Sequence, residues 1–116
     1  METRKYLFET RWKQFLTEQT VRIGNLEVYD APLPQKMTWD KATAAAQALG
    51  DGWRLATKQE FILLFKNRDK IPNLLEGAYW TSELVANKED EAIAWRVVGF
   101  ANKPKVNEYF VLPVKG

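Results

Sequence analysis

The chain has 116 residues, of which 46% are hydrophobic and 28% are charged, and this size suits one domain with one core. Its 17 Lys and Arg against 15 Asp and Glu give a net charge of +2 with interspersed signs, so nucleic acid is not an expected partner. The absence of Cys and His excludes disulfides, thiol nucleophiles, zinc or copper sites and imidazole chemistry.

The first 19 residues carry an apolar stripe at helical spacing. Phe8, Trp12, Phe15 and Leu16 recur three or four residues apart, with Lys, Arg and Glu between them. The pattern predicts an amphipathic helix over residues 5–19, packed on or next to a domain of residues 20–116. Packing on the chain's own core is the preferred interpretation, and docking onto another chain is the alternative.

No apolar run has the length of a signal sequence core or a membrane span. We therefore expect no membrane insertion, and a cytoplasmic or virion-associated location.

Strand and helix patterns follow each other over residues 21–50. Residues 21–34 alternate apolar and polar positions around Gly24-Asn25, which predicts a hairpin with a turn or bulge at that pair. The run TWDKATAAAQALG then predicts a helix that Thr38 caps and that ends at Gly50.

The stretch LGDGWRLATKQEF, residues 49–61, predicts a corner between two helices. Gly50 or Gly52 lets the chain leave the first helix in a left-handed conformation. Thr57 and Glu60 have the spacing of a capping box for a second helix, which fades at residues 67–70. Between them, Arg54 is expected to bind a carboxylate or carbonyls structurally, because its fixed fork of donors suits that role.

Three later segments are rich in aromatic and β-branched residues and predict strands at 78–84, 92–100 and 107–114. The last two are apolar on both faces, which is typical of central strands. Pro113 lacks a donor and predicts an edge or a bulge near the end. Polar segments at 86–91 and 101–107 are expected to connect the strands.

In this order the elements resemble the Lcl C-terminal-like family of bacterial and phage proteins, from about residue 23 to residue 114. The resemblance rests on IGNLEV, MTWDKATAAAQALGDGWRLATKQEF, YWTSE, AIAWRVVGF and YFVLPVK. Three features depart from the family pattern. Ala56 replaces a usual proline, Thr81-Ser82-Glu83 replaces a Ser-Ser-Thr string, and Leu112 and Lys115 replace frequent arginines.

The resemblance implies an α+β, C-type-lectin-like fold, in which two helices flank a small, mostly antiparallel sheet and the first and last strands pair. The extra N-terminal helix would be an addition to it. The residues that match best are expected to hold the scaffold, and they are Trp39, Trp53, Arg54, Leu55, Trp80 and Trp95.

The fold implied by the resemblance predicts a non-enzymatic binding module that uses loops at one end of the scaffold, with a protein or a surface glycan as ligand. The candidate ligand-binding residues are Glu83, Asn87, Asp90, Asn102, Lys105 and Asn107. No cofactor and no metal is expected. The Glu-Pro-Asn, Gln-Pro-Asp and Trp-Asn-Asp strings of calcium-dependent sugar-binding C-type lectins are absent, and so is the EF-hand pattern.

Three other functions fit the sequence less well than a binding module does. An enzyme is disfavoured, because the usual nucleophile and base pairings need Cys or His and the similar formylglycine-generating enzymes depend on cysteine. Nucleic-acid binding is disfavoured, because Glu2, Glu9 and Glu18 dilute the basic residues near the start. A structural or assembly subunit, in a phage particle or a surface complex, that docks through the N-terminal helix remains the alternative.

Overall fold

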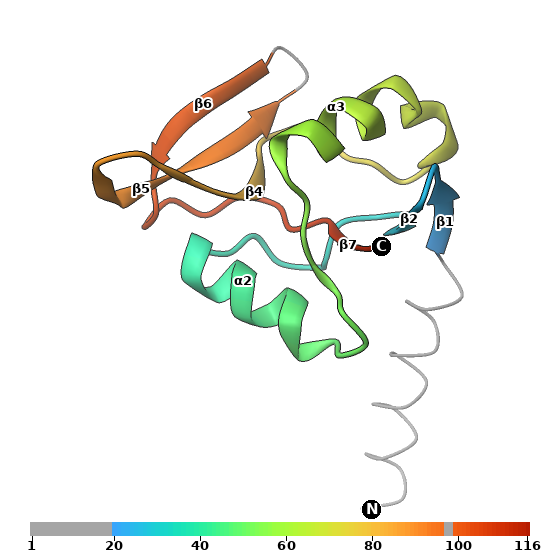
Figure 1. Cartoon of the computed structure of the whole chain (residues 1–116), viewed down its shortest axis with the longest axis horizontal. Coiled ribbons are helices and arrows are strands. Elements are labelled where there is room, and N and C mark those ends of the chain that lie inside the picture. Colours follow the sequence, from blue (N-terminus) through green and yellow to red (C-terminus); the bar gives the residue numbers. More distant parts are fainter. Residues whose placement is uncertain (1–19, 97–98) are drawn as a thin grey trace, which may run out of the picture.

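Two helices and two antiparallel sheets make up the part of the chain that the computed structural model describes, residues 20–96 and 99–116 (Figure 1). Helix α2 spans Trp39–Ala48, helix α3 spans Lys58–Lys66, and a short 3-10 turn, η1, spans Arg68–Lys70. Helices α2 and α3 lie on opposite sides of the short strands β3 and β7 (Figure 1). The helix predicted over residues 5–19 lies outside the described residues.

The first sheet has the strand order β1-β2-β7-β3. Its strands are β1 (Thr20–Ile23), β2 (Leu26–Tyr29), β3 (Arg54–Leu55) and β7 (Pro113–Lys115). The predicted hairpin at Gly24-Asn25 is confirmed, because Ile23 pairs with Leu26 and Gly24 has a φ of 61°. The resemblance implied that the first and last strands pair. Instead, the last strand, β7, pairs with β2, and β1 lies at the edge of the sheet on the other side of β2.

The prediction that Pro113 marks an edge or a bulge is wrong. Strand β7 lies inside the sheet, between β2 and β3. Pro113 is its first residue and pairs with Leu55, whereas pairing with β2 begins one residue later, at Val114. A proline at the first position of a strand leaves the rest of the ladder intact.

The second sheet consists of β4 (Tyr79–Val85), β5 (Lys88–Arg96) and β6 (Gly99–Pro104), in that order. The predicted bounds of the last two strands are wrong. The segment predicted as one strand over 92–100 belongs to both β5 and β6, and the polar residues 88–91 and 101–104, predicted as connections, are in strands. The predicted strand at 107–114 is mostly irregular, with isolated bridges at Tyr109 and Phe110 before β7.

The helix boundaries follow the predicted caps with one exception. Thr57 and Glu60 form the predicted capping box at the start of α3. Thr38 precedes α2 in an extended conformation as predicted, but its hydroxyl makes no capping hydrogen bond. Gly50 and Gly52, with φ of 76° and 86°, both adopt the left-handed conformation expected after α2.

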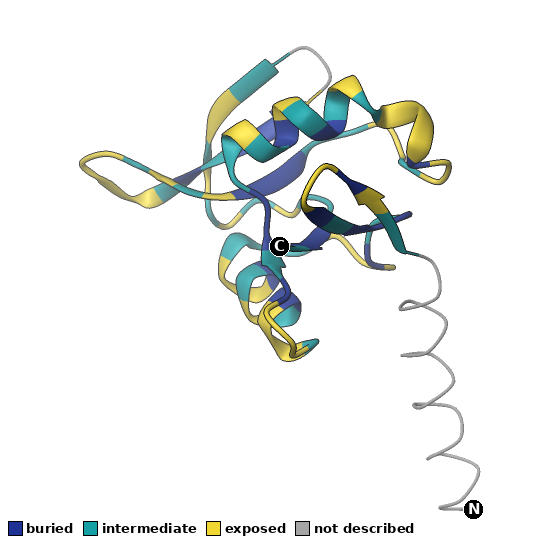
Figure 2. Ribbon diagram, turned by 45° about the vertical axis from the view of Figure 1, so that its right-hand side comes forward, coloured by how far each residue is buried: buried dark blue, intermediate teal, exposed yellow. Residues whose placement is uncertain are grey.

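The core is aromatic and joins α3 to the second sheet. Phe61 of α3 stacks on Trp95 of β5, with ring centroids 5.1 Å apart, and both rings pack near Tyr79 of β4. Burial raises the pKa of Tyr79 to about 12, while its hydroxyl donates to the carbonyl of Leu75. Buried residues fill the middle of the molecule, and exposed residues gather at the β4–β5 turn and on the outer sides of both helices (Figure 2).

Among the described helices, none has the length and apolar character that a membrane span requires.

Candidate functional site at the end of the three-stranded sheet

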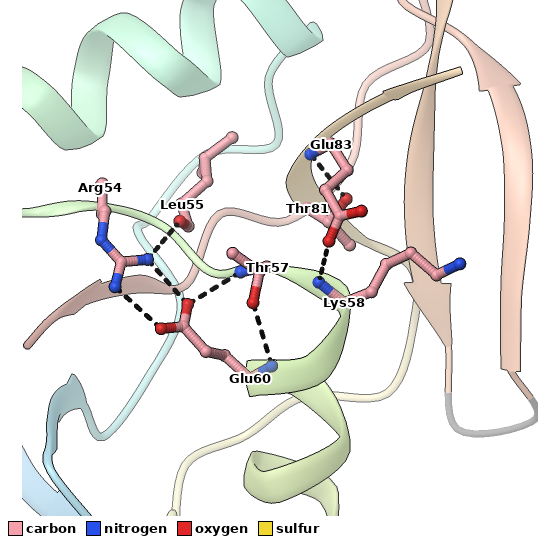
Figure 3. A network of polar contacts seen from close by, with 7 residues as sticks. All are labelled: Arg54, Leu55, Thr57, Lys58, Glu60, Thr81 and Glu83. Atoms are coloured by element: carbon pink, nitrogen blue, oxygen red, sulfur yellow. Dashed lines mark hydrogen bonds and ion pairs between the residues drawn. The ribbon is translucent and has the colours of Figure 1, made fainter. Parts of the chain in front are cut away.

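The joint between α2 and α3 is held by one ion pair (Figure 3). Arg54 donates from Nη1 and Nη2 to the two carboxylate oxygens of Glu60, at 2.7 and 2.8 Å, and from Nη1 to the carbonyl of Leu55. The structural role predicted for Arg54 is therefore confirmed. These hydrogen bonds from Arg54 lower the pKa of Glu60 and raise the pKa of Arg54.

Glu83 ties strand β4 to the start of α3. Its Oε2 accepts a hydrogen bond from the backbone amide of Lys58 at 2.7 Å, and its own amide donates to the hydroxyl of Thr81 (Figure 3). The Thr81 hydroxyl in turn donates to the carbonyl of Ile93 in β5. Glu83, predicted as a ligand-binding residue, thus lies against α3 and away from the β4–β5 turn.

Asp90 and Lys105 lie together at the end of the three-stranded sheet. The amide of Lys105 donates to the carbonyl of Asp90 at 2.8 Å, and the carbonyl of Lys105 accepts from the amide of Trp39 at 3.0 Å. The ammonium of Lys105 lies 4.9 Å from the centre of the Trp39 ring, and the Trp39 indole donates to the carbonyl of Thr81. The start of α2 therefore fixes the turn after β6 to the sheet.

The three predicted asparagines occupy different positions. Asn87 is exposed in the β4–β5 turn with a φ of 63°. Asn102 is exposed on β6 opposite Ile93, so by strand alternation it shares the face of Glu91 and not that of Asp90. Asn107 donates from its side-chain amide to the Tyr109 hydroxyl and is half-buried. The sheet end therefore brings Asn87, Asp90 and Lys105 to one region and leaves Asn102 on the other face.

Two exposed apolar side chains near this region were not among the predicted site residues. Leu84, opposite Ala92 on β4, is 53% exposed, and Val106, in the turn after β6, is 79% exposed. Val106 lies between two polar residues, whereas Leu84 lies between Glu83 and Val85. A single apolar residue in a strand or turn carries no signal of exposure. The sheet-end surface is defined here as Leu84, Asn87, Asp90, Lys105 and Val106.

The acidic residues near the β4–β5 turn do not form a cation site. Glu89 and Glu91 alternate with Asp90 along β5, so their side chains point to opposite faces of the sheet. Glu83 is already hydrogen-bonded to Lys58. Within residues 20–96 and 99–116, no three Asp or Glu side chains lie close enough together to hold a metal ion.

Comparison with solved structures gives the class of fold, which is C-type-lectin-like. Botrocetin, a snake C-type-lectin-like protein, superposes with a TM-score of 0.64 at 13% identity, over 84% of this chain and 97% of that one. A chain of the complex of botrocetin with a mutant von Willebrand factor A1 domain superposes with a TM-score of 0.60 at 12% identity, over 84% of this chain and 95% of that one.

The sequence itself matches no protein-family model and no curated protein. The structural likeness to botrocetin confirms the predicted C-type-lectin-like fold. The narrower resemblance to the Lcl C-terminal-like family stays a prediction, because no family model matches.

Proposed function

We propose that the chain is a non-enzymatic binding module that recognises a protein partner through the sheet-end surface. The observation that carries the proposal is the combination of a fixed backbone with exposed side chains at the end of the three-stranded sheet. Lys105 is bound to both Asp90 and Trp39 through its backbone, while Leu84, Asn87 and Val106 remain exposed. A preorganised backbone lowers the entropy that binding costs.

The composition of the sheet-end surface favours a protein over a glycan. Leu84 and Val106 offer apolar contact area, and Asp90 and Lys105 offer charges of both signs. Apolar side chains within a polar rim are typical of protein–protein interfaces. The structural likeness to botrocetin, one of whose structures is a complex with the von Willebrand factor A1 domain, also supports a protein partner.

The chemistry of the described residues supports binding rather than catalysis. The carboxylate whose pKa is clearly displaced, that of Glu60, is displaced downward by Arg54 and is engaged in the capping box. The tyrosines with raised pKa, Tyr29 and Tyr79, are buried in the core. General acids and bases instead need a pKa near the working pH.

Affinity capture from native extract tests this proposal with two double variants that are matched in chemistry. The test variant, Leu84→Asp with Val106→Asp, places charges on the sheet-end surface. The control variant, Ile62→Asp with Leu75→Asp, places the same charges on exposed residues elsewhere, which are 47% and 53% exposed. We expect the wild type and the control to capture the same protein, and the test variant to retain about a tenth of it or less, as for a buried contact worth at least about 1.4 kcal/mol.

Circular dichroism first establishes that both variants are folded. Equal capture by the two variants would contradict the proposed surface. Capture that survives proteolysis of the extract but is lost after periodate oxidation would identify a glycan ligand and contradict the proposed partner class.

A further inference from the structure

Strand β6 has one side without a partner strand. It is the last strand of the three-stranded sheet, and no strand within residues 20–96 and 99–116 pairs with its outer side (Figure 1). An unpaired strand edge presents backbone amides and carbonyls that can pair with a further strand. The register of the sheet decides which residues of β6 present them.

The direction of the backbone groups follows from strand β4. The amide of Trp80 in β4 donates to the carbonyl of Phe110, so it points away from Ala94, the partner of Trp80 in β5. In an antiparallel ladder, pairs that exchange hydrogen bonds alternate with pairs that do not. The backbone groups of Ala94 therefore face β6, where the register pairs Ala94 with Ala101.

The residues on either side of Ala101, Phe100 and Asn102, thus direct their amides and carbonyls to the open edge. None of these four groups has a hydrogen-bond partner among the described residues. The edge ends at Pro104, which has no amide to donate and whose carbonyl accepts from the amide of Asn107 at 3.0 Å. The open edge of β6 therefore offers free donors and acceptors at two alternate residues.

The side chains beside this edge differ between the two faces of the sheet. On one face Lys103 lies opposite Ala92, in the same cross-strand row as the exposed Leu84 of the sheet-end surface. On the other face the ammonium of Lys58 lies 5.4 Å from the centre of the half-buried Phe100 ring. A strand laid along β6 places its side chains alternately beside Lys103 and beside Phe100.

We propose that the protein partner adds an extended segment to β6 as an antiparallel strand, and that this segment alternates acidic and apolar residues. Its backbone pairs with Phe100 and Asn102, its acidic side chains lie beside Lys103, and its apolar side chains lie beside Phe100. A second copy of the chain brings further ammonium groups to the edge instead, and lysines on an edge strand disfavour such pairing. The segment belongs to the partner of the sheet-end surface, so its assignment rests on the proposed function.

The probe is a capped peptide of alternating Glu and Val, about eight residues long, and the control peptide has Lys in place of Glu. Amide NMR signals of the isotope-labelled full-length protein give the Kd of each peptide. Hydrogen exchange is then measured with the Glu-Val peptide at about ten times its Kd, where we expect the amides of Phe100 and Asn102 to exchange about tenfold more slowly. The amides of Ala101 and Lys103, which already face β5, should keep their rates. We expect the Lys-Val peptide to bind at least about fivefold more weakly.

Two variants separate backbone pairing from side-chain contact. Asn102→Pro removes an outward amide without breaking the ladder to β5, and the matched control, Asn102→Ala, keeps that amide and removes only the side chain. Circular dichroism first establishes that both are folded. We expect Asn102→Pro to raise the Kd of the Glu-Val peptide about fivefold or more, as for one hydrogen bond, and Asn102→Ala to change it by less than about twofold.

No binding of the Glu-Val peptide, equal affinity for both peptides, or slowed exchange without alternation along β6 would overturn the proposal. Protection of Phe100 and Asn102 that grows with protein concentration in the absence of peptide would also overturn it, since by mass action it would identify a second copy as the occupant. The capture test at Leu84 and Val106 uses other residues, so a failure of the sheet-end surface and a failure of strand addition are told apart.

Discussion

At the residue scale, the Arg54–Glu60 pair explains why the short segment between the helices contains so many specific residues. Gly50 and Gly52 turn the chain, Trp53 and Leu55 are buried, and Arg54 between them binds Glu60 of the next helix. Glu60 also accepts from the amide of Thr57, which completes the capping box. The Glu60 carboxylate therefore accepts hydrogen bonds both from Arg54 of β3 and from the backbone amide at the start of α3.

The replacement Glu60→Gln tests this role through its dependence on pH. Arg54 lowers the pKa of Glu60 in the folded protein from its ordinary value of 4.5, so Glu60 stabilises the fold above that pH and loses its contribution as the pH falls through the lowered value. We expect the variant to be less stable than the wild type by roughly 1–3 kcal/mol near neutral pH. Denaturant unfolding should show this difference shrinking below pH 4.5. A difference that does not change with pH would contradict the role of the charge.

At the element scale, the side chain of Glu83 connects β4 to α3. The predicted site residues therefore include one whose side chain is bound within the fold, Glu83, and one whose side chain is exposed, Asp90. A carboxylate at a helix start satisfies a free amide and interacts favourably with the helix dipole. Asp90 was predicted for the same site. Its backbone carbonyl accepts a hydrogen bond from the amide of Lys105, and its side chain is exposed. The two acidic residues should therefore respond differently to the same replacement.

We expect Glu83→Ala to lower the free energy of unfolding by about 1 kcal/mol, because the amide of Lys58 loses its partner. Asp90→Ala, the matched control, should change it by less than about 0.5 kcal/mol, as exposed replacements usually do. Thermal and denaturant unfolding of both variants measures the difference. Equal stability of the two variants would show that Glu83 is as free as Asp90.

The same elements show what the sequence could and could not predict. Helix α3 and its capping box were predictable, because capping is local and depends on the spacing of Thr57 and Glu60. The late strands were predictable in kind but not in extent. The polar ends of β5 and β6 extend beyond the core but still pair as strands. Residues 109–112 are apolar and are buried or half-buried, but they form no strand, and only Tyr109 and Phe110 make isolated bridges. Apolar character reports burial and does not by itself report strand pairing.

At the scale of the whole molecule, the aromatic core fixes the second sheet against α3, and the start of α2 fixes its far end. Phe61 and Trp95 provide the first connection, and Trp39 with Lys105 provides the second. Of the predicted site, Asn87, Asp90 and Lys105 belong to one surface. Glu83, Asn102 and Asn107 could not be separated from them by sequence, because strand register and side-chain partners decide which face each residue takes.

Binding of a protein partner at the sheet-end surface can be tested by mapping the footprint of the captured partner on the isotope-labelled protein. The measurement is the change in backbone amide NMR signals on adding the unlabelled partner. We expect the largest changes on residues 84–90 and 102–107, with Ile62 and Leu75 unaffected. Changes confined to Ile62, Leu75 and the outer side of α3 would contradict it.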